Sequence, residues 1–147
     1  MEDPSCYLHV HGGKFALVPY CREDDKPFTV YEAVEIFSTR VSNETLGKAI
    51  LSSFQKSRTN VSSNDEGLSL EDIAKLFGER SYGGFEKRSM QLGIVKTPNC
   101  YSLLPMKWDG RGWDYLEAVP LELSASPQEL AEACRRILGL AVRGKEA

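Results

Sequence analysis

The alternation of apolar and polar residues in the first part of the chain predicts three strands. Residues 6–11 and 14–19 alternate on either side of Gly12-Gly13. A glycine pair between two alternating runs is typical of a tight hairpin, because both turn positions require a positive φ. Residues 28–37 alternate as well and predict a third strand.

The second part of the chain repeats this pattern. Residues 89–96 and 101–106 alternate on either side of a turn at 97–100, where Pro98 occupies a position that type I turns favour. Residues 115–123 predict one further strand. The pattern therefore indicates a sheet of about six strands, mostly antiparallel because short turns connect neighbouring strands.

Two helices are predicted by apolar residues that recur every three or four positions. The first begins after Ser42 or Asn43. The second begins at residues 126–129, which supply a cap, a proline at the first helical position and an acid in the first turn. The apolar faces consist of Leu46, Ile50 and Phe54 in the first helix and of Leu130, Cys134, Ile137 and Leu138 in the second.

The middle of the chain carries weaker signals. Residues 59–67 are rich in Ser and Asn and predict a polar linker. A capping box at 69–72 predicts a short helix that buries Leu70, Ile73 and Phe77.

The two parts of the chain resemble each other in order and spacing. Matching prolines are 105 − 19 = 86 residues apart, matching glutamates 117 − 32 = 85, and matching leucines 130 − 46 = 84. Three matches in order suggest two related halves, each a hairpin, a third strand and a helix. The predicted fold class is α+β: a mostly antiparallel sheet of about six strands with helices packed on it, in two related ββ(β)α halves.

Length and charge restrict the kind of protein. A chain of 147 residues, 41% of them hydrophobic, fits one domain spanning residues 1–147. With 18 basic and 21 acidic residues the net charge is −3, whereas a nucleic-acid-binding protein usually carries a basic excess. We expect no direct contact with nucleic acid. A basic partner suits this charge better than an anionic one.

The cysteines and apolar runs bear on the compartment. Cys6, Cys21, Cys100 and Cys134 are widely separated and form no C-x-x-C motif, which favours reduced thiols in a cytoplasmic protein, although spacing alone leaves disulfide pairing open. The first residues do not resemble a signal peptide, and no run approaches the ~18 apolar residues that span a membrane. We expect a cytoplasmic protein without a membrane contact.

The sequence offers few groups for catalysis. His9 and His11 share one face of a strand, but no third histidine or cysteine pair completes a zinc site, so a plain surface hairpin is the favoured interpretation. Neither histidine accompanies a nucleophile motif, and the glycine-rich segments lack the Lys-Ser/Thr of a phosphate loop. We predict no enzyme activity, no cofactor and no metal site.

Two segments are candidates for binding a partner. The first comprises Glu23, Asp24 and Asp25, whose simpler interpretation is a solvated loop. The second runs from Trp108 to Asp114, which we predict to form a glycine-rich loop. Trp and Arg dominate the energetics of interfaces, although Trp113 could instead close one end of the core. The candidate residues of this second segment are Trp108, Asp109, Arg111, Trp113 and Asp114.

Four stretches together resemble the immunity proteins of bacterial contact-dependent growth inhibition. They are residues 43–51, residues 89–96, the Gly-Arg-Gly-Trp sequence at 110–113 and the helix start at 126–130. The resemblance implies a cytoplasmic protein without activity of its own, a monomer when free. It would bind and block a toxin domain, often a nuclease, at the C-terminus of an exoprotein from neighbouring cells.

Two other functions remain open from the sequence. A small nuclease-type enzyme would need a cleft where His9 or His11 meets carboxylates. A small oligomerising regulatory module would pack the tryptophan segment against a second copy of the chain.

Overall fold

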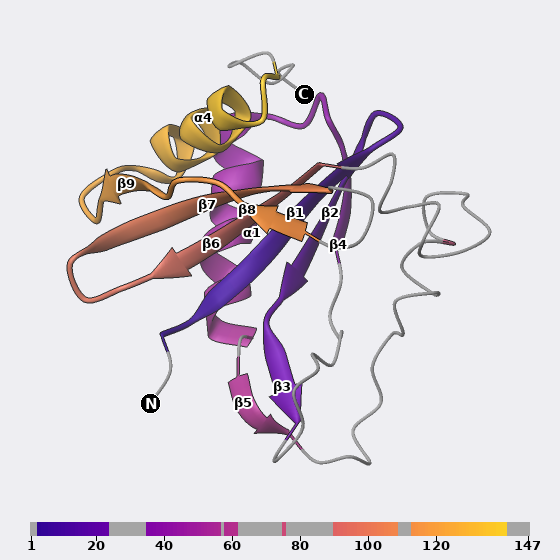
Figure 1. The fold of residues 1–147 in the computed structure, drawn as a ribbon. Helices are drawn as coiled ribbons and strands as arrows, with labels where there is room; N and C mark the ends of the chain where they lie inside the picture. The colour runs from indigo at the N-terminus through magenta and orange to yellow at the C-terminus, as the bar shows by residue number, and fades with distance from the viewer. Residues whose placement is uncertain are drawn as a thin grey trace.

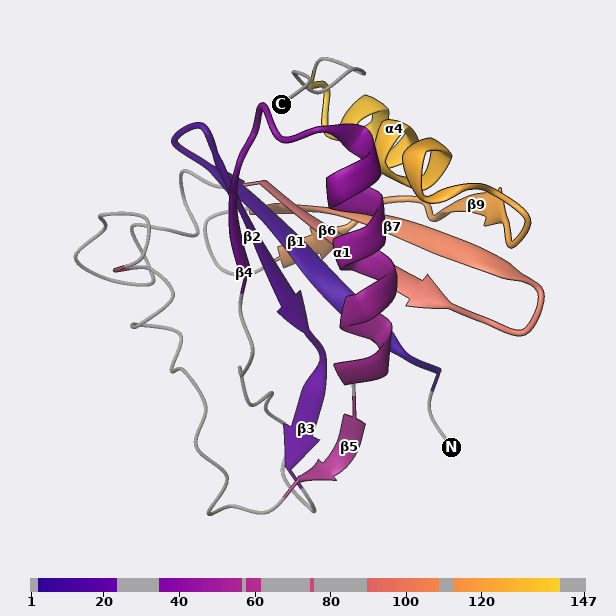
Figure 2. The ribbon, with the colours of Figure 1, turned by 180° about the vertical axis from the view of Figure 1, so that it is seen from behind.

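The computed structural model describes residues 3–23, 35–56, 58–61, 75, 90–108 and 113–140. Within them, one antiparallel sheet is covered on one face by two helices, so the α+β prediction is confirmed (Figures 1 and 2). The sheet contains β1 (Ser5–His11), β2 (Lys14–Pro19), β4 (Glu35–Ser38), β6 (Met90–Lys96), β7 (Cys100–Trp108), β8 (Trp113–Tyr115) and β9 (Val119–Glu122). The helices are α1 (Asn43–Lys56) and α4 (Pro127–Ile137), which pack against each other.

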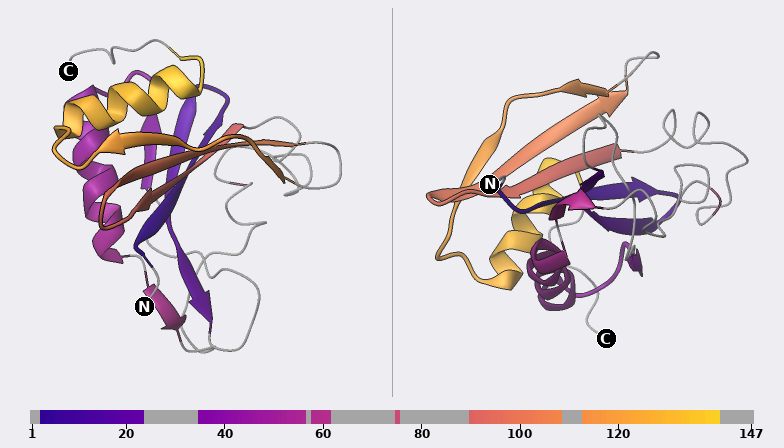
Figure 3. Two further views of the ribbon diagram at one scale, coloured as in Figure 1. Left: turned by 60° about the vertical axis from the view of Figure 1, so that its left-hand side comes forward. Right: turned by 90° about the horizontal axis from the view of Figure 1, so that it is seen from below.

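The sheet order agrees with two related halves. The order is β4-β2-β1-β6-β7-β8, and β9 also pairs with β7, beyond the end of β8. Counted outward from the centre, the first half contributes β1, β2 and β4, and the second contributes β6, β7 and β9 in the same order. The central pair, β1 and β6, is antiparallel. Figure 3 shows from two further sides that α1 and α4 lie on the same side of the sheet.

The first hairpin forms as predicted. Gly12 and Gly13 have φ values of 57° and 76°, in the region that residues with a Cβ avoid. The turn sets the register in which Val10 faces Phe15 and Leu8 faces Leu17. These apolar pairs therefore all point to the helix-covered face.

The predicted apolar positions build one core between the sheet and the helices. Both predicted helix faces contribute to it, and of the four residues predicted for the second face only Ile137 is partly exposed. Phe54 of α1 stacks on Tyr101 of β7 with ring centroids 6.1 Å apart. The fully buried core residues include Cys6, Leu8, Phe15, Leu17, Leu46, Ile50, Leu92, Ile94, Leu103, Leu130 and Cys134.

Both helix starts are capped as predicted. The Ser42 hydroxyl accepts a hydrogen bond from the Thr45 backbone N–H at 3.2 Å. At the start of α4, Ser126 accepts from the Glu129 N–H at 3.1 Å, and the Glu129 carboxylate accepts from the Ser126 N–H at 2.9 Å. These two bonds form a capping box, and the hydrogen bond from the Ser126 backbone N–H lowers the pKa of the Glu129 carboxylate.

A buried arginine in α4 makes hydrogen bonds to the first half of the chain near the start of α1. Arg135 of α4 is 2% exposed. Its Nε donates to Asn43 Oδ1 at 2.7 Å and its Nη1 to the Thr39 carbonyl at 2.6 Å, while Nη2 donates to the Val41 carbonyl. The guanidinium also lies 5.4 Å from the centre of the Phe15 ring. This fork of donors satisfies two carbonyl oxygens in the turn before α1 and the side-chain oxygen of its first residue.

One boundary prediction is wrong, and two others lie largely outside the described residues. The strand predicted at 28–37 appears as β4 from Glu35, and residues 28–34 lie outside the described residues. The linker predicted at 59–67 overlaps β5 (Arg58–Val61), which pairs in parallel with β3 (Cys21–Glu23) in a second, two-stranded sheet below the first in Figure 1. Pairing with a segment distant in sequence makes this strand, so local polarity did not reveal it. Of the short helix predicted after the capping box at 69–72, the structure describes only Lys75, which is helical.

The last predicted strand, 115–123, is also divided. Tyr115 ends β8, and β9 begins at Val119. Residues 115–123 do alternate, but one extra residue between β8 and β9 interrupts their pairing with β7.

Two further findings concern the cysteines and the membrane. Cys6, Cys100 and Cys134 are free thiols, and burial raises the pKa of Cys6 to about 12 and raises that of Cys134 as well. Across the described part of the chain, we find no helix with the length and apolarity to cross a bilayer.

Candidate partner-binding surface

The acidic segment is only partly visible. Glu23 is the last residue of β3, where its Cα partner is Val61 of β5. The prediction that Glu23 lies in a loop is therefore wrong, because pairing with β5 extends the strand to this residue. Asp24 and Asp25 lie outside the described residues.

The tryptophan segment is a strand connection. Trp108 ends β7 and Trp113 begins β8, and the two are Cα partners across the pair. The prediction that both lie in a loop is wrong, because the antiparallel ladder extends to these two residues. Asp114 is paired opposite Lys107 in the same ladder. Asp109 and Arg111 lie outside the described residues.

The fold does not bring the two candidate segments together through the sheet. β2, which leads into β3, and β8 are separated by β1, β6 and β7. The described residues therefore do not join the acidic and tryptophan segments into one surface. The two tryptophans instead lie at the point where β8, an edge strand of the main sheet, begins to pair with β7.

That edge contains a β-bulge. Met106 pairs with Tyr115, and Leu103 pairs with Val119. The two pairs are three residues apart along β7 but four residues apart along the edge. The extra residue lies between Tyr115 and Val119, as in a bulge. The Leu116 N–H donates to the Pro105 carbonyl at 2.9 Å, which keeps the chain against β7 on the β8 side of the bulge.

The edge exposes apolar side chains that sequence analysis missed. The exposed fractions are 52% for Leu116 and 42% for Val119, and Glu117, Ala118 and Pro120 between and beside them are exposed too. We call residues 116–122 the β9 edge. One sequence signal could have found it: a proline inside a strand pattern indicates an edge strand, because proline cannot donate to a second neighbour.

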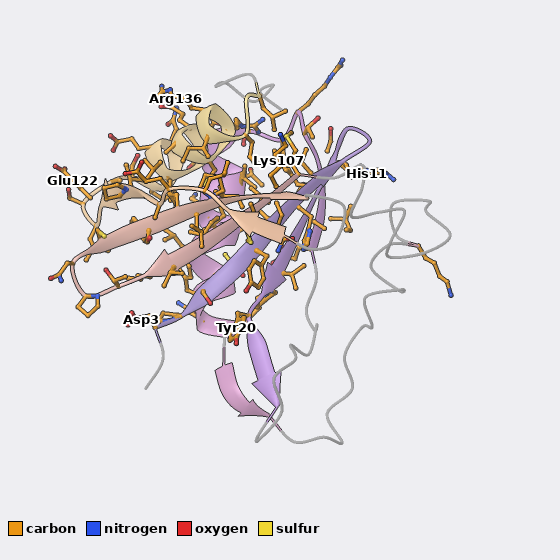
Figure 4. The ribbon with its side chains drawn as sticks, viewed as in Figure 1. Asp3, His11, Tyr20, Lys107, Glu122 and Arg136 are labelled. Carbon is orange, nitrogen blue, oxygen red and sulfur yellow. The ribbon has the colours of Figure 1, made fainter. Side chains whose placement is uncertain are left out.

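Negative charge is concentrated in the sequence segment that contains this edge. Residues 113–134 contain no Lys or Arg, so their net charge is −5, and the rest of the chain carries −3 − (−5) = +2. Figure 4 shows Glu122 and His11 at opposite ends of the sheet, so the hairpin histidine lies far from the edge. The acidic residues of this segment are Asp114, Glu117, Glu122, Glu129 and Glu132.

The histidines do not form a site on the surface. His9 is 1% exposed, and burial lowers its pKa to about 4, so it is neutral at physiological pH. The prediction of a plain surface hairpin is wrong for His9, which is buried along with its Cα partners on both neighbouring strands, Ala16 and Gln91. His11, nearer the turn, is half-buried. Among the residues with described positions, no group of three His, Cys, Asp or Glu residues could hold a metal ion.

Comparisons with known proteins give the fold a context. No protein-family model matches the sequence, and no curated protein matches it. Among solved structures, a protein of unknown function from Neisseria meningitidis is similar with a TM-score of 0.71 and 18% identity, over 94% of each chain. A chain of a CdiA-CT/CdiI toxin and immunity complex from Yersinia pseudotuberculosis is similar with a TM-score of 0.71 and 13% identity, over 95% of this chain and 97% of that one. At these identities the likeness is one of fold.

Proposed function

We propose that this protein is an immunity protein of contact-dependent growth inhibition. It binds the C-terminal toxin domain of an exoprotein, a nuclease, and neutralises it in the cytoplasm. The protein is a monomer when free and has no catalytic activity of its own.

The observation that carries this proposal is the shared fold. Nearly the whole chain superposes on a chain of a toxin and immunity complex, with no large insertion or missing half. The excess of acid in residues 113–134, which include the β9 edge, supports the same proposal, because an acidic surface complements a basic nuclease and steers its association.

The residues proposed to contact the toxin come from the two segments found in the sequence. We propose Glu23, Asp24 and Asp25 from the first. From the second, Trp108 and Trp113 supply apolar contact area beside charged neighbours. Those charged neighbours are Asp109, Arg111 and Asp114.

The proposal predicts an exoprotein gene immediately upstream of the gene for this chain, and it is tested with the C-terminal domain of that exoprotein. That domain is induced in a bacterial host with or without this protein. We expect growth arrest by the domain alone, recovery on co-expression, and a one-to-one complex in sedimentation of the purified pair. Continued arrest together with no detectable complex contradicts the proposal.

The two contact segments are tested separately. Replacing Glu23, Asp24 and Asp25 with Lys should slow association and alter its salt dependence. Trp108→Ala should weaken binding by ~2 kcal/mol or more if this side chain is a hot spot. An unchanged association rate or affinity removes the corresponding segment from the interface.

A further inference from the structure

The β9 edge carries half of the large apolar residues that are exposed in the described part of the chain. The four are Leu116, Val119, Met90 and Ile36, and two of them lie within four residues of each other here. Single exposed apolar residues are normal on a protein surface. A pair on one short segment of a folded edge is less common, and it marks a surface that a partner can cover.

The edge is held in place by the sheet. β9 pairs with residues 100–103 of β7, and Tyr101 and Leu103 in that stretch are buried in the core. On the other side of the bulge, the Leu116 N–H is bonded to Pro105. Leu116 and Val119 therefore project from an ordered backbone, which lowers the entropy cost of binding.

The same backbone is poorly suited to pairing with another strand. The bulge interrupts the regular repeat of donors and acceptors, and Pro120 has no N–H to offer. Glu117 and Glu122 add exposed charges, which natural edge strands use to prevent strand addition. Recognition at this edge therefore depends on side chains.

The charges indicate what kind of partner fits. No Lys or Arg occurs between residues 113 and 134, so no cation of that segment neutralises Glu117 or Glu122. A second copy of this chain would place like charges against each other. A basic protein surface with an apolar centre would instead pair with both carboxylates.

We infer that the β9 edge is a docking surface for a basic protein partner, in which Leu116 and Val119 fill the centre and Glu117 and Glu122 pair with Lys or Arg side chains around them. This inference rests on the proposed function, because the partner is the toxin domain. It adds a surface that neither of the two sequence-derived segments contains.

The test compares double variants of this protein against the upstream-encoded toxin domain by surface plasmon resonance. Leu116→Ala with Val119→Ala should raise Kd at least about 10-fold, mainly through faster dissociation. Glu117→Lys with Glu122→Lys should slow association and reduce its dependence on salt. The matched controls are Ile36→Ala on the opposite edge strand and Asp3→Lys, an exposed acid before β1, which should leave binding unchanged.

The possible outcomes separate this inference from the proposed function. If wild type binds and both edge variants bind as tightly and as fast, the docking surface is wrong while the proposed function stands. If wild type does not bind the domain at all, the proposed function fails first. If the free protein sediments as a dimer that Leu116→Glu disrupts, the edge is covered by a second copy and the inference is overturned.

Discussion

Gly47 should tolerate no side chain, because α1 and α4 meet at this residue. A Cβ at Gly47 would lie 1.9 Å from the carbonyl oxygen of Pro127, 2.3 Å from its carbonyl carbon and 2.8 Å from its Cα. All three are main-chain atoms of the first residue of α4. Because these are main-chain atoms, no side-chain rotation relieves the overlap. The capping box between Ser126 and Glu129 also holds the backbone of this turn in place.

The expected loss of stability follows from the displacement required. An ordinary contact begins at 3.4 Å, so the helices must separate by 3.4 − 1.9 = 1.5 Å. Inserting a methyl group into a packed interface costs ~1–3 kcal/mol, and a shift of two main chains belongs at the upper end. Alanine recovers ~1 kcal/mol of helix propensity relative to glycine. We therefore expect Gly47→Ala to reduce the free energy of unfolding by about 2 kcal/mol.

The measurement is urea denaturation followed by circular dichroism, with Gly93→Ala as the matched control. At Gly93 the new Cβ would lie 3.3 Å from Met106 Cε, the end of a flexible side chain that can move. This variant should change the free energy of unfolding by less than about 1 kcal/mol. If Gly47→Ala is as stable as wild type, or no less stable than Gly93→Ala, the proposed close contact between the helices is wrong.

Three further predictions concern buried or capping groups. Arg135→Lys should lower the free energy of unfolding by about 2 kcal/mol, because an ammonium cannot reach all three acceptors of the guanidinium fork; a urea midpoint equal to wild type would contradict this. Burial lowers the pKa of His9 from 6.5 to about 4 in the folded protein. The neutral imidazole therefore makes its full contribution to the free energy of unfolding above pH 6.5, and this contribution is lost as the pH falls toward 4. Urea titrations should show a loss of about 2 kcal/mol between pH 7 and 5 in wild type that His9→Gln lacks, and equal losses would refute the assignment. Ser126→Ala should cost about 1 kcal/mol by removing one bond of the capping box, whereas Ser124→Ala, outside the box, should cost much less in the same assay.

The sequence determined the elements whose cause is local. The hairpin at Gly12-Gly13, the alternation around Leu92 and the capping box at Ser126 each depend on neighbouring residues, so their patterns predict them directly. The similarity of the two halves also followed from spacing alone, and the sheet order agrees with it. Where pairing with a distant strand decided the result, as at β5, the prediction was wrong.

The candidate surface was predicted only in part, for the same physical reason. The tryptophans were found because of their residue type, but their pairing as the last step of β7 and β8 depends on the folded ladder. Leu116 and Val119 were placed inside a predicted strand, since an alternating pattern gives the period of a strand and not its place in the sheet.

What the sequence by itself determined is thus the fold class and the two repeated units. Only the tertiary structure decided which polar residues are buried and which apolar residues are exposed. His9 is buried on β1 at the centre of the sheet, and Val119 is exposed on β9 at its edge. Both positions depend on strand order, which is fixed by contacts between residues far apart in the chain.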